Sequence, residues 1–553
     1  MPVVPTYPGI YIDEILSSAH TISAAPTSLA VFIGYTHPFK TLQFVDPNVS
    51  ITTPVRLFGT TDFEREFGGF FSNRAFDSSL DFSSVGIAVY QFFLNGGAEC
   101  YVVGLRPRGS SPAGPIQPHT VTVGGVSFTQ IELTEDPDAS GSGDHRMRID
   151  VTNPRADPST AMPDHKLADV TITYGAGPGA LVERFRGVSL NPLLPNGKPN
   201  PNYIGTRIGT TPGAGSTLVN VTLPLPTTFA AGSAPMESTH FGATVFALAD
   251  YNKAMDNNTP LDKLAIFNLM NLPGVTDNGA LSTAVAFCER KLAFLLVDPL
   301  QTSAADDQGG PNTTPIEAIV EGNSPQHPPP PLEKNAALYF PYLQASDPVS
   351  GAIIEIPPGG TVAGIMSRID LSRGVWKAPA GYETTIINTT GVVARGRMTN
   401  DQQGVLNQIG VNCLRDFPGV GTVVFGARTL VIGNAALAHD WGYVPVRRMA
   451  LFLEQTLLAN LGWVVFEPND VPLWTSIRTS IEAFMLGLFR QHAFQGATPD
   501  EAFQVKCDST TTTQADIDIG IVNIVVAFAP LRPAEFVIVK ITQLAGQAQA
   551  AAA

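Results

Sequence analysis

Acidic residues that lie close together in this 553-residue sequence are the first candidates for chemistry, because paired carboxylates can bind a cation or exchange protons. Two such pairs occur, Asp306-Asp307 and Asp516 with Asp518. The second pair would project from one face of a predicted strand and could bind a cation. A solvated hairpin edge is the simpler interpretation, so we predict no metal site there.

The nine histidines and four cysteines are dispersed along the chain. His145 and His165 fall in a β-rich segment, His327 lies in a proline run, and no histidine stands at metal-ligand spacing from a second one. The cysteines contain no C-x-x-C pair; they are Cys100, Cys288, Cys413 and Cys507. We therefore predict reduced, buried thiols and neither a disulfide framework nor a zinc site.

Short catalytic motifs are absent from the sequence. There is no G-x-S-x-G, no G-x-x-x-x-G-K-[ST] and no H-E-x-x-H. The glycine-rich runs "GAGPGA" at Gly175 and "PPGGTVAG" at Pro357 lack the strand–Gly–helix context of a dinucleotide site, and we predict loops there. We expect no enzymatic activity and no cofactor. A hydrolase remains an alternative, because a Ser/His/Asp set is spatial rather than sequential.

Four arginines are candidates for contacts between subunits. Arg447 and Arg448 open a predicted helix, and in a chain with few charges they could form salt bridges within the chain or contact a neighbouring subunit. Arg478 and Arg490 lie on the next predicted helix and are further candidates for an intermolecular contact. That helix has Asp470 as its candidate N-cap, and its apolar stripe consists of Trp474, Ile477, Ile481, Phe484 and Leu488.

Composition excludes some functions. Hydrophobic residues make up 44% of the chain and charged residues only 15%, so part of the surface could be covered by partners. The formal net charge of -15 disfavours a nucleic-acid partner. The first residues lack the basic and apolar regions of a secretory signal, and the longest apolar run, from Ile519, is too short to span a bilayer. We expect a soluble protein that folds in the cytoplasm.

The pattern of predicted elements indicates a multidomain protein of α/β and α+β class. Buried strands alternate with amphipathic helices in residues 26–106 and again in 237–425, which implies a parallel sheet. Residues 107–236 are rich in Pro, Gly, Thr and Ser, with short alternating runs, and predict an inserted β-rich domain. Residues 426–545 predict an α+β domain, and a disordered tail occupies 546–553.

Both ends of the chain contain an alternating stretch without an obvious partner strand. Residues 1–25 form an arm that begins with "YPGIYIDEI" and continues into the small, polar linker "SSAHTISAAPTS". Near the other end, "DIDIGIVNIVVAFAP" and "PAEFVIVKIT" both predict strands. A strand at a free end can pair with the exposed sheet edge of another molecule.

Several stretches, in order, resemble the contractile tail sheath family of phage tails and phage-tail-like injection particles. The opening "YPGIYIDEI", "TSLAVFIGYT" and "PVRLFGTTDFEREFGG" is similar to the start of that family, and "YQFFLNGGAECYVVGL" to its next block. "IPPGGTVAGIMSRIDLSRGVWKAPAG" closely matches its middle. "LNQIGVNCLRDFPGVGTVVFGARTL", "VPVRRMALFLEQTL", "VVFEPNDVPLW", "ATPDEAFQVKCD" and "APLRPAEFVIVKI" follow in family order. The resemblance covers residues 7–105 and about 240–545.

The resemblance implies a structural subunit that stacks in hexameric rings around an inner tube and contracts to drive the tube through a target envelope. It implies a subtilisin-like α/β core by fold, without catalysis. The implied partners are other copies of the chain, the inner tube protein, and baseplate and terminal cap proteins, with no nucleic acid and no direct membrane insertion. Assembly in the bacterial cytoplasm is implied, in a particle that is released or membrane-attached. Another self-assembling tube or capsid protein is the further alternative.

The resemblance also assigns roles to the two terminal stretches, which would add strands to a small sheet on neighbouring subunits. The inter-subunit residues are Tyr7, Pro8, Gly9, Ile10, Tyr11, Ile12, Phe536, Val537, Ile538, Val539, Lys540 and Ile541. Burying three aliphatic side chains stabilises by roughly 5–8 kcal/mol. Ordering a free arm costs about 1–2 kcal/mol per residue. One arm would therefore bind weakly, and a lattice of many arms is expected to gain from simultaneous contacts. The linker "SSAHTISAAPTS" is expected to act as a flexible hinge during contraction.

Overall fold

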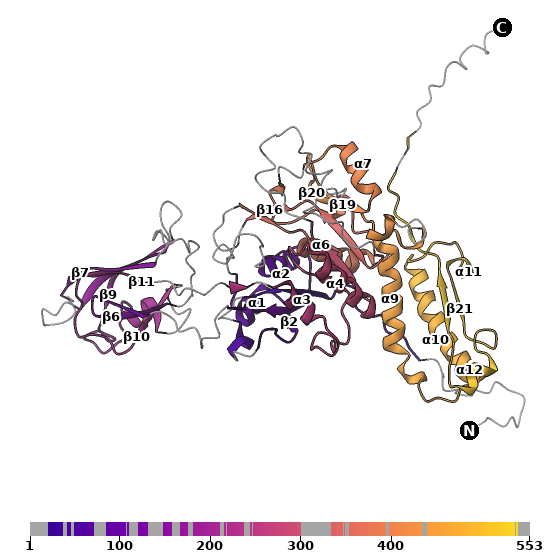
Figure 1. The fold of residues 1–553 in the computed structure, drawn as a ribbon, viewed down its shortest axis with the longest axis horizontal. Coiled ribbons are helices and arrows are strands. Elements are labelled where there is room, and N and C mark those ends of the chain that lie inside the picture. The colour runs from indigo at the N-terminus through magenta and orange to yellow at the C-terminus, as the bar shows by residue number, and fades with distance from the viewer. Residues whose placement is uncertain are drawn as a thin grey trace, which may run out of the picture.

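The structure, a computed structural model, describes residues 20–36, 41–45, 49–70, 84–106, 108–109, 120–130, 147–156, 166–174, 181–210, 215–216, 218–236, 244–245, 247–299, 333–346, 348, 353–393, 397–433, 439–536 and 538–539. The described elements form a mixed α/β, multidomain protein. Figure 1 shows a β-rich part at the left and an α/β core in the middle. At the right lie two long antiparallel helices, α9 (Val444–Asn460) and α10 (Val471–Arg490).

An eight-stranded sheet with the order β2-β3-β1-β13-β14-β15-β19-β20 is the centre of the core. Its strands are β1 (Ala30–Tyr35), β2 (Val55–Leu57), β3 (Cys100–Leu105), β13 (Leu269–Asn271), β14 (Phe294–Val297), β15 (Ala336–Phe340), β19 (Val411–Phe417) and β20 (Gly421–Phe425). The strands from β3 to β19 run parallel, and β2 and β20 are antiparallel edges. Strands β1, β14 and β15 are buried throughout, which explains their continuous apolar sequences.

Helices cover both faces of this sheet. On one face, α1 (Thr60–Phe67), α2 (Ser84–Leu94) and α6 (Gly359–Arg373) pack over the β1 side chains of Ala30 and Phe32. On the other face, α3 (Leu248–Ala254) and α4 (Asn278–Arg290) pack over Val31 and Ile33. The period of two along β1 thus sends alternate side chains into two separate apolar layers.

The glycine-rich run that begins at Pro357 is a helix start and not the loop that we predicted. It follows β17 (Ile353–Ile356) and forms the first turns of α6. A Cβ at Gly360 would lie 2.4 Å from the carbonyl oxygen of Ala88, and one at Gly364 would lie 2.5 Å from that of Phe92. These glycines let the backbones of α6 and α2 approach each other. The prediction of a loop was wrong because glycine is required here by the close packing of α6 against α2, which the local sequence does not show.

The segment between the two halves of the core forms two further sheets. One has the order β10-β6-β5 and the other β11-β7-β8-β9. The strands are β5 (Thr120–Val123), β6 (Val126–Gln130), β7 (Met147–Arg155), β8 (Leu167–Tyr174), β9 (Leu181–Ser189), β10 (Val219–Thr222) and β11 (Gly232–Met236). They enclose their own apolar core, together with a short helix at Gly205–Gly209. A small antiparallel pair, β4 (Arg108–Gly109) with β12 (Thr244–Val245), joins the chain entering and leaving this part. The run from Gly175 lies outside the described residues.

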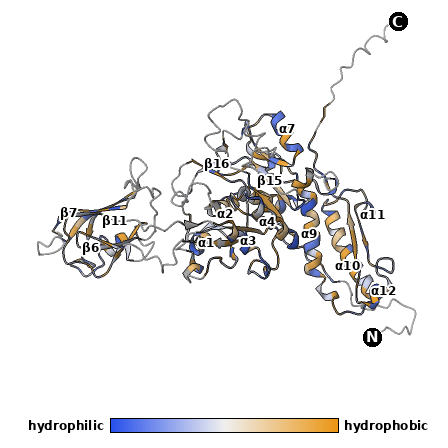
Figure 2. Ribbon diagram, viewed as in Figure 1, coloured by the Kyte–Doolittle hydropathy of each residue, from blue (hydrophilic) through white to orange (hydrophobic). Residues whose placement is uncertain are grey.

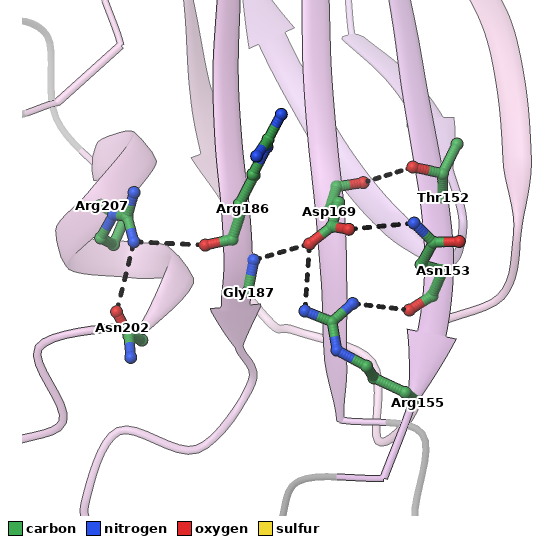
Figure 3. Close-up of polar contacts among 8 residues, drawn as sticks. All are labelled: Thr152, Asn153, Arg155, Asp169, Arg186, Gly187, Asn202 and Arg207. Atoms are coloured by element: carbon green, nitrogen blue, oxygen red, sulfur yellow. Dashed lines mark hydrogen bonds and ion pairs between the residues drawn. The ribbon is translucent and has the colours of Figure 1, made fainter.

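One carboxylate connects three strands of this β-rich part (Figure 3). Asp169 on β8 accepts hydrogen bonds from the Asn153 side chain at 3.0 Å, from the Arg155 guanidinium at 3.1 Å and from the Gly187 backbone N–H at 2.7 Å. These donors stabilise the ionised form and lower the pKa of Asp169 to about 2. The strand register shifts beside it on both pairings, so Asp169 satisfies backbone and side-chain donors where the ladder is irregular.

The C-terminal part is built on α9 and α10, on which hydrophobic and hydrophilic residues are mixed along the length (Figure 2). Asp470 caps α10, as predicted, by accepting a hydrogen bond from the Leu473 N–H. The predicted stripe of α10 faces an apolar cluster, although Phe484 is only partly buried. The remaining elements are α11 (Pro499–Ala502), β21 (Phe503–Lys506), α12 (Gln514–Asp518) and β22 (Val525–Phe528).

Smaller elements complete the described chain. Strands β16 (Leu343–Ser346), β17 and β18 (Gly391–Val392) form a sheet with the order β17-β16-β18. Helix α7 (Asn400–Gln408) precedes β19 and begins with a capping box between Thr399 and Gln402. Short 3-10 turns lie at Leu42–Val45, Tyr382–Thr384, Leu430–Gly433 and Gly462–Val464.

One of the two strand predictions near the C-terminus needs correction. The stretch "DIDIGIVNIVVAFAP" is only partly extended, because its first residues belong to α12 and only Val525–Phe528 form a strand. In "PAEFVIVKIT" the described residues, up to 536 and 538–539, lie in no strand of this chain. Local alternation predicts a strand only where a partner edge is available.

Candidate functional site

Within the described residues, the acidic, histidine and cysteine side chains do not come together in one site. No group of three or more His, Cys, Asp or Glu side chains that could hold a metal occurs in the described part of the chain. Asp516 and Asp518 lie on α12 and not on the strand that we predicted; Asp516 closes a capping box with Thr513. All four cysteines are buried, and burial raises the pKa of the Cys413 thiol to about 12. His145, His165 and His327 lie outside the described residues, as do Asp306 and Asp307.

Asp298 is a buried carboxylate at the carboxyl end of β14, a position where parallel sheets often hold functional groups. It accepts hydrogen bonds from the Gly359 N–H at 2.6 Å, the Gly274 N–H at 3.0 Å and the Asn271 side chain at 3.1 Å. Burial raises its pKa to about 6, although all three donors favour the ionised form. Because Gly359 begins α6, Asp298 acts as a cap for that helix and orders the loop at Gly274.

Arg448 and Arg447 are buried inside the subunit. Arg448 pairs with Asp370 at 2.5 Å, with side-chain exposures of 3% and 2%, and also donates to the Thr27 carbonyl oxygen at 2.9 Å. Arg447 donates to the Asn335 side chain at 2.7 Å and lies 3.2 Å from Glu454. Of the two interpretations left open by the sequence, these contacts correspond to the one within the chain. Neither guanidinium is free in this structure to contact another subunit.

Residues 20–28, which we expected to be a flexible linker, are attached to α9 by side-chain hydrogen bonds. The Asn460 amide accepts from the Ser23 N–H at 3.0 Å and donates to the Ser23 carbonyl oxygen at 2.8 Å. The Thr456 hydroxyl accepts from the Ala25 N–H at 3.1 Å. This extended segment, which we call the strap, obtains from side chains the hydrogen bonds that a strand would obtain from a neighbouring strand.

The start of the strap is attached to the middle of α10 and to the connection between the two helices. The His20 N–H donates to the Ser480 hydroxyl of α10 at 3.0 Å. The His20 ring stacks on Trp463 with a centroid distance of 3.9 Å. Ile22 packs against the apolar cluster of α9 and α10. The point from which residues 1–19 leave is therefore fixed beside the connection between α9 and α10.

A buried amide network attaches the end of the strap to the core. The Asn268 side chain accepts from the Leu29 N–H at 2.9 Å and donates to the Pro26 carbonyl oxygen at 2.7 Å and to Gln455 at 2.6 Å. Gln455, on α9, donates in turn to the Phe267 carbonyl oxygen at 2.8 Å. Asn268, directly before β13, thus positions the strap where it enters β1, and Gln455 on α9 holds Asn268 in place. The prediction of a flexible hinge is wrong for residues 20–28.

The other end of the chain leaves from a second fixed point. Arg428 forms an ion pair with Glu535, and the two side chains are only 12% and 16% exposed. Arg428 also donates to the Asn407 carbonyl oxygen at 2.7 Å, which joins the tail to the end of α7. Immediately after this pair the chain is apolar and exposed: Phe536, Ile538 and Val539 are at least three-quarters exposed.

A short two-stranded sheet lies on the outer side of α10. β21 and β22 pair antiparallel, from Phe503 with Phe528 to Lys506 with Val525, and are the two strands of this sheet within the described residues. Val525 is half exposed. An unpaired strand edge of this kind can accept a further strand.

The predicted inter-subunit residues have different outcomes. Tyr7 to Ile12 lie outside the described residues, as do Val537, Lys540 and Ile541. Arg478 is partly exposed and lies 3.9 Å from Glu482, and Arg490 is exposed at the end of α10. The sequence interpretation missed Asp298, the Asn268–Gln455 network and the Arg428–Glu535 pair. The residues that bond in each of these contacts are far apart in the sequence. The one available sequence signal was a polar residue directly beside an apolar strand.

The described part of the chain combines a mostly parallel α/β core, a β-rich insertion and a C-terminal part built on two long helices. Residues 249–430 match the family model of the phage tail sheath protein central domain. No curated protein matches the sequence.

Solved sheath structures share the fold over nearly the whole chain. The sheath of an extracellular contractile injection system, PVC, in the contracted state is 20% identical, covers 98% of this chain and 99% of its own, and has a TM-score of 0.54. The contracted helical sheath of the anti-feeding prophage (AFP) is 22% identical, with coverage of 98% and 100% and a TM-score of 0.53. A chain of the AFP baseplate is 22% identical, with coverage of 98% and 99% and a TM-score of 0.51. No described helix is long and apolar enough to cross a membrane.

Proposed function

We propose that the chain is a structural subunit of a contractile tail sheath. Copies would stack as hexameric rings around an inner tube and contract to drive the tube through a target envelope. The observation that carries this proposal is the match of residues 249–430 to the sheath central domain, in a chain similar in fold to solved sheath structures that align with 98% of it.

The terminal arms are proposed to connect the subunits. Phe536, Ile538 and Val539 are exposed immediately beyond the Arg428–Glu535 pair and would add a strand to another subunit. The N-terminal arm, Tyr7 to Ile12, would do the same. The two-stranded sheet β21–β22 is the acceptor that we propose, because its outer edges lack partner strands within the described residues.

The fixed attachment points change where flexibility is needed during contraction. Because the strap is bonded from His20 onward and the tail is bonded at Glu535, the hinges would lie before residue 20 and after residue 535. Subunits would then rotate as rigid bodies while the arms keep neighbours connected.

The proposed partners are further copies of the chain, the inner tube protein, and baseplate and terminal cap proteins. Solved relatives that are described as sheath complexes and as baseplates support self-association and baseplate association. Assembly in the bacterial cytoplasm, in a phage tail or a phage-tail-like particle, completes the proposal. We regard the core as subtilisin-like in fold only and propose no catalysis.

Negative-stain microscopy of the purified chain tests the proposal. We expect ribbed, hollow tubes from the full chain, and folded monomers without tubes from a variant that lacks residues 1–20. Ordered tubes from the truncated variant would refute the role of the N-terminal arm. Dispersed full-length protein that labels with a serine-hydrolase probe would instead favour the hydrolase alternative.

A further inference from the structure

The connection between α9 and α10 ends in an exposed apolar surface, the apolar tip, formed by Val465, Phe466, Val471, Ile519 and Ile521. Phe466 is 102% exposed and has a backbone φ of 73°. A bulky residue in this left-handed region costs about 1–3 kcal/mol. A strained and fully exposed phenylalanine gains nothing within its own subunit, so its position is explained by a contact with another surface.

The apolar tip is surrounded by negative charge. Glu467 and Asp470 flank it in the connection itself, and Asp518 precedes Ile519 on the neighbouring segment. Residues 461–477 and 507–531 contain no Lys or Arg. A complementary partner surface must therefore be apolar at its centre and positively charged at its rim.

A groove of that description lies at the other end of α10. Its volume is about 820 Å³, and it lies between the segment 373–381, α7 and the C-terminal tail. Trp376, Phe425 and Leu531 provide apolar lining. Arg373, Lys377 and Arg532 bring positive charge to the same groove, and Arg373 also pairs with Glu383. The acidic lining residue Glu535 is paired with Arg428. Arg490, one of the arginines predicted to make an intermolecular contact, is exposed next to the lining residue Gln491.

The tip cannot reach the groove of its own subunit. Phe466 precedes the first residue of α10, whereas Gln491 and His492 of the groove follow its last residue. The 20 residues of α10 separate the two surfaces by about 30 Å. In Figure 1, α12 lies at the lower end of α10, and the chain leaves toward the C-terminus at the upper end. Only a second copy of the chain can bring a tip into the groove.

We propose that the apolar tip of one subunit docks into the groove beneath the C-terminal tail of another copy, with Phe466 as the apolar anchor. The two surfaces differ, so the contact is head-to-tail, and repeating it generates an open helical array and not a closed dimer. The inference rests on the proposed sheath function and identifies a contact that does not involve strand exchange by the arms.

Cysteine cross-linking in the full chain tests this contact. Phe466→Cys is combined with Gly404→Cys, a groove position on α7 where an added Cβ meets nothing within 4 Å. Under mild oxidation we expect a ladder of disulfide-linked multimers from the double variant and no ladder from either single variant. The matched control combines Gly404→Cys with Leu458→Cys, because Leu458 is 74% exposed on α9 but lies outside the tip. The native cysteines are buried.

The outcomes separate this inference from the proposed function. Tubes in the microscope without a ladder from the double variant would overturn the tip–groove contact and leave the sheath proposal intact. A ladder of equal strength from the Leu458 control would also overturn it. Maleimide protection of Phe466→Cys only after addition of an inner tube protein would assign the tip to the tube instead. As an independent measurement, Phe466→Ala should raise the critical concentration for polymerisation at least tenfold, and Leu458→Ala should not.

Discussion

The attachment of the strap to α9 can be tested by removing the side chains that hold it. Asn460→Ala removes the two hydrogen bonds to Ser23, and Thr456→Val removes the one to Ala25 while keeping the side-chain volume. At about 1 kcal/mol net for each bond, the double variant should lose about 3 kcal/mol of local stability. That loss corresponds to about a 100-fold increase in opening of the strap.

Native-state hydrogen exchange measures this opening directly, because the Ser23 and Ala25 amides donate to the two mutated side chains. We expect these amides to exchange about 100-fold faster, while amides of β1, which lies inside the sheet, keep their wild-type rates. Thr283→Ala is the control, since the Thr283 hydroxyl bonds only within α4. Unchanged exchange at Ser23 and Ala25 would refute the anchoring role. Equally accelerated exchange in β1 would show global destabilisation instead of local release.

Three further predictions concern buried or bonded charges. Burial raises the pKa of Asp298 to about 6, so the folded state binds the carboxyl proton more tightly than the unfolded state does. The contribution of Asp298 to the free energy of unfolding should therefore fall as pH rises from about 4 to 6. The difference in that free energy between wild type and Asp298→Asn should shrink over this range by up to about 3 kcal/mol. For Asp169 the pKa is lowered to about 2, so its contribution of about 1–2 kcal/mol should be lost as pH falls from 4 to 2, and Asp169→Asn should flatten acid unfolding there. Arg428→Ala should release the C-terminal tail and accelerate cleavage by a glutamyl endopeptidase after Glu535 at least tenfold. Arg56→Ala, which removes an exposed ion pair elsewhere, should leave that rate unchanged.

The strands of the core and the long helices could be predicted from local pattern. The run "LAVFIGYT" indicated a buried strand because both faces of β1 are covered, and the α10 stripe indicated its buried face. Asp470 was predictable as a cap because capping is a contact within one turn. In each case the decisive interactions lie within a few residues in the sequence.

The failures have a common physical cause, which is dependence on distant partners. The strap resembled a flexible linker because its small, polar residues carry no pattern, yet Asn268, Thr456 and Asn460 form hydrogen bonds with it from hundreds of residues away. The run at Pro357 resembled a loop because the need for glycine arises only where α6 meets α2.

The sequence by itself determined the order of the core strands and long helices, the low charge and the family resemblance. These depend only on local periodicity, composition and short sequence motifs. Only the tertiary structure decided the role of each charge and each exposed apolar residue. It placed Arg448 in a buried pair with Asp370, and it placed Phe466 and the groove at opposite ends of α10. Burial and separation are properties of the folded chain, and no local pattern encodes them.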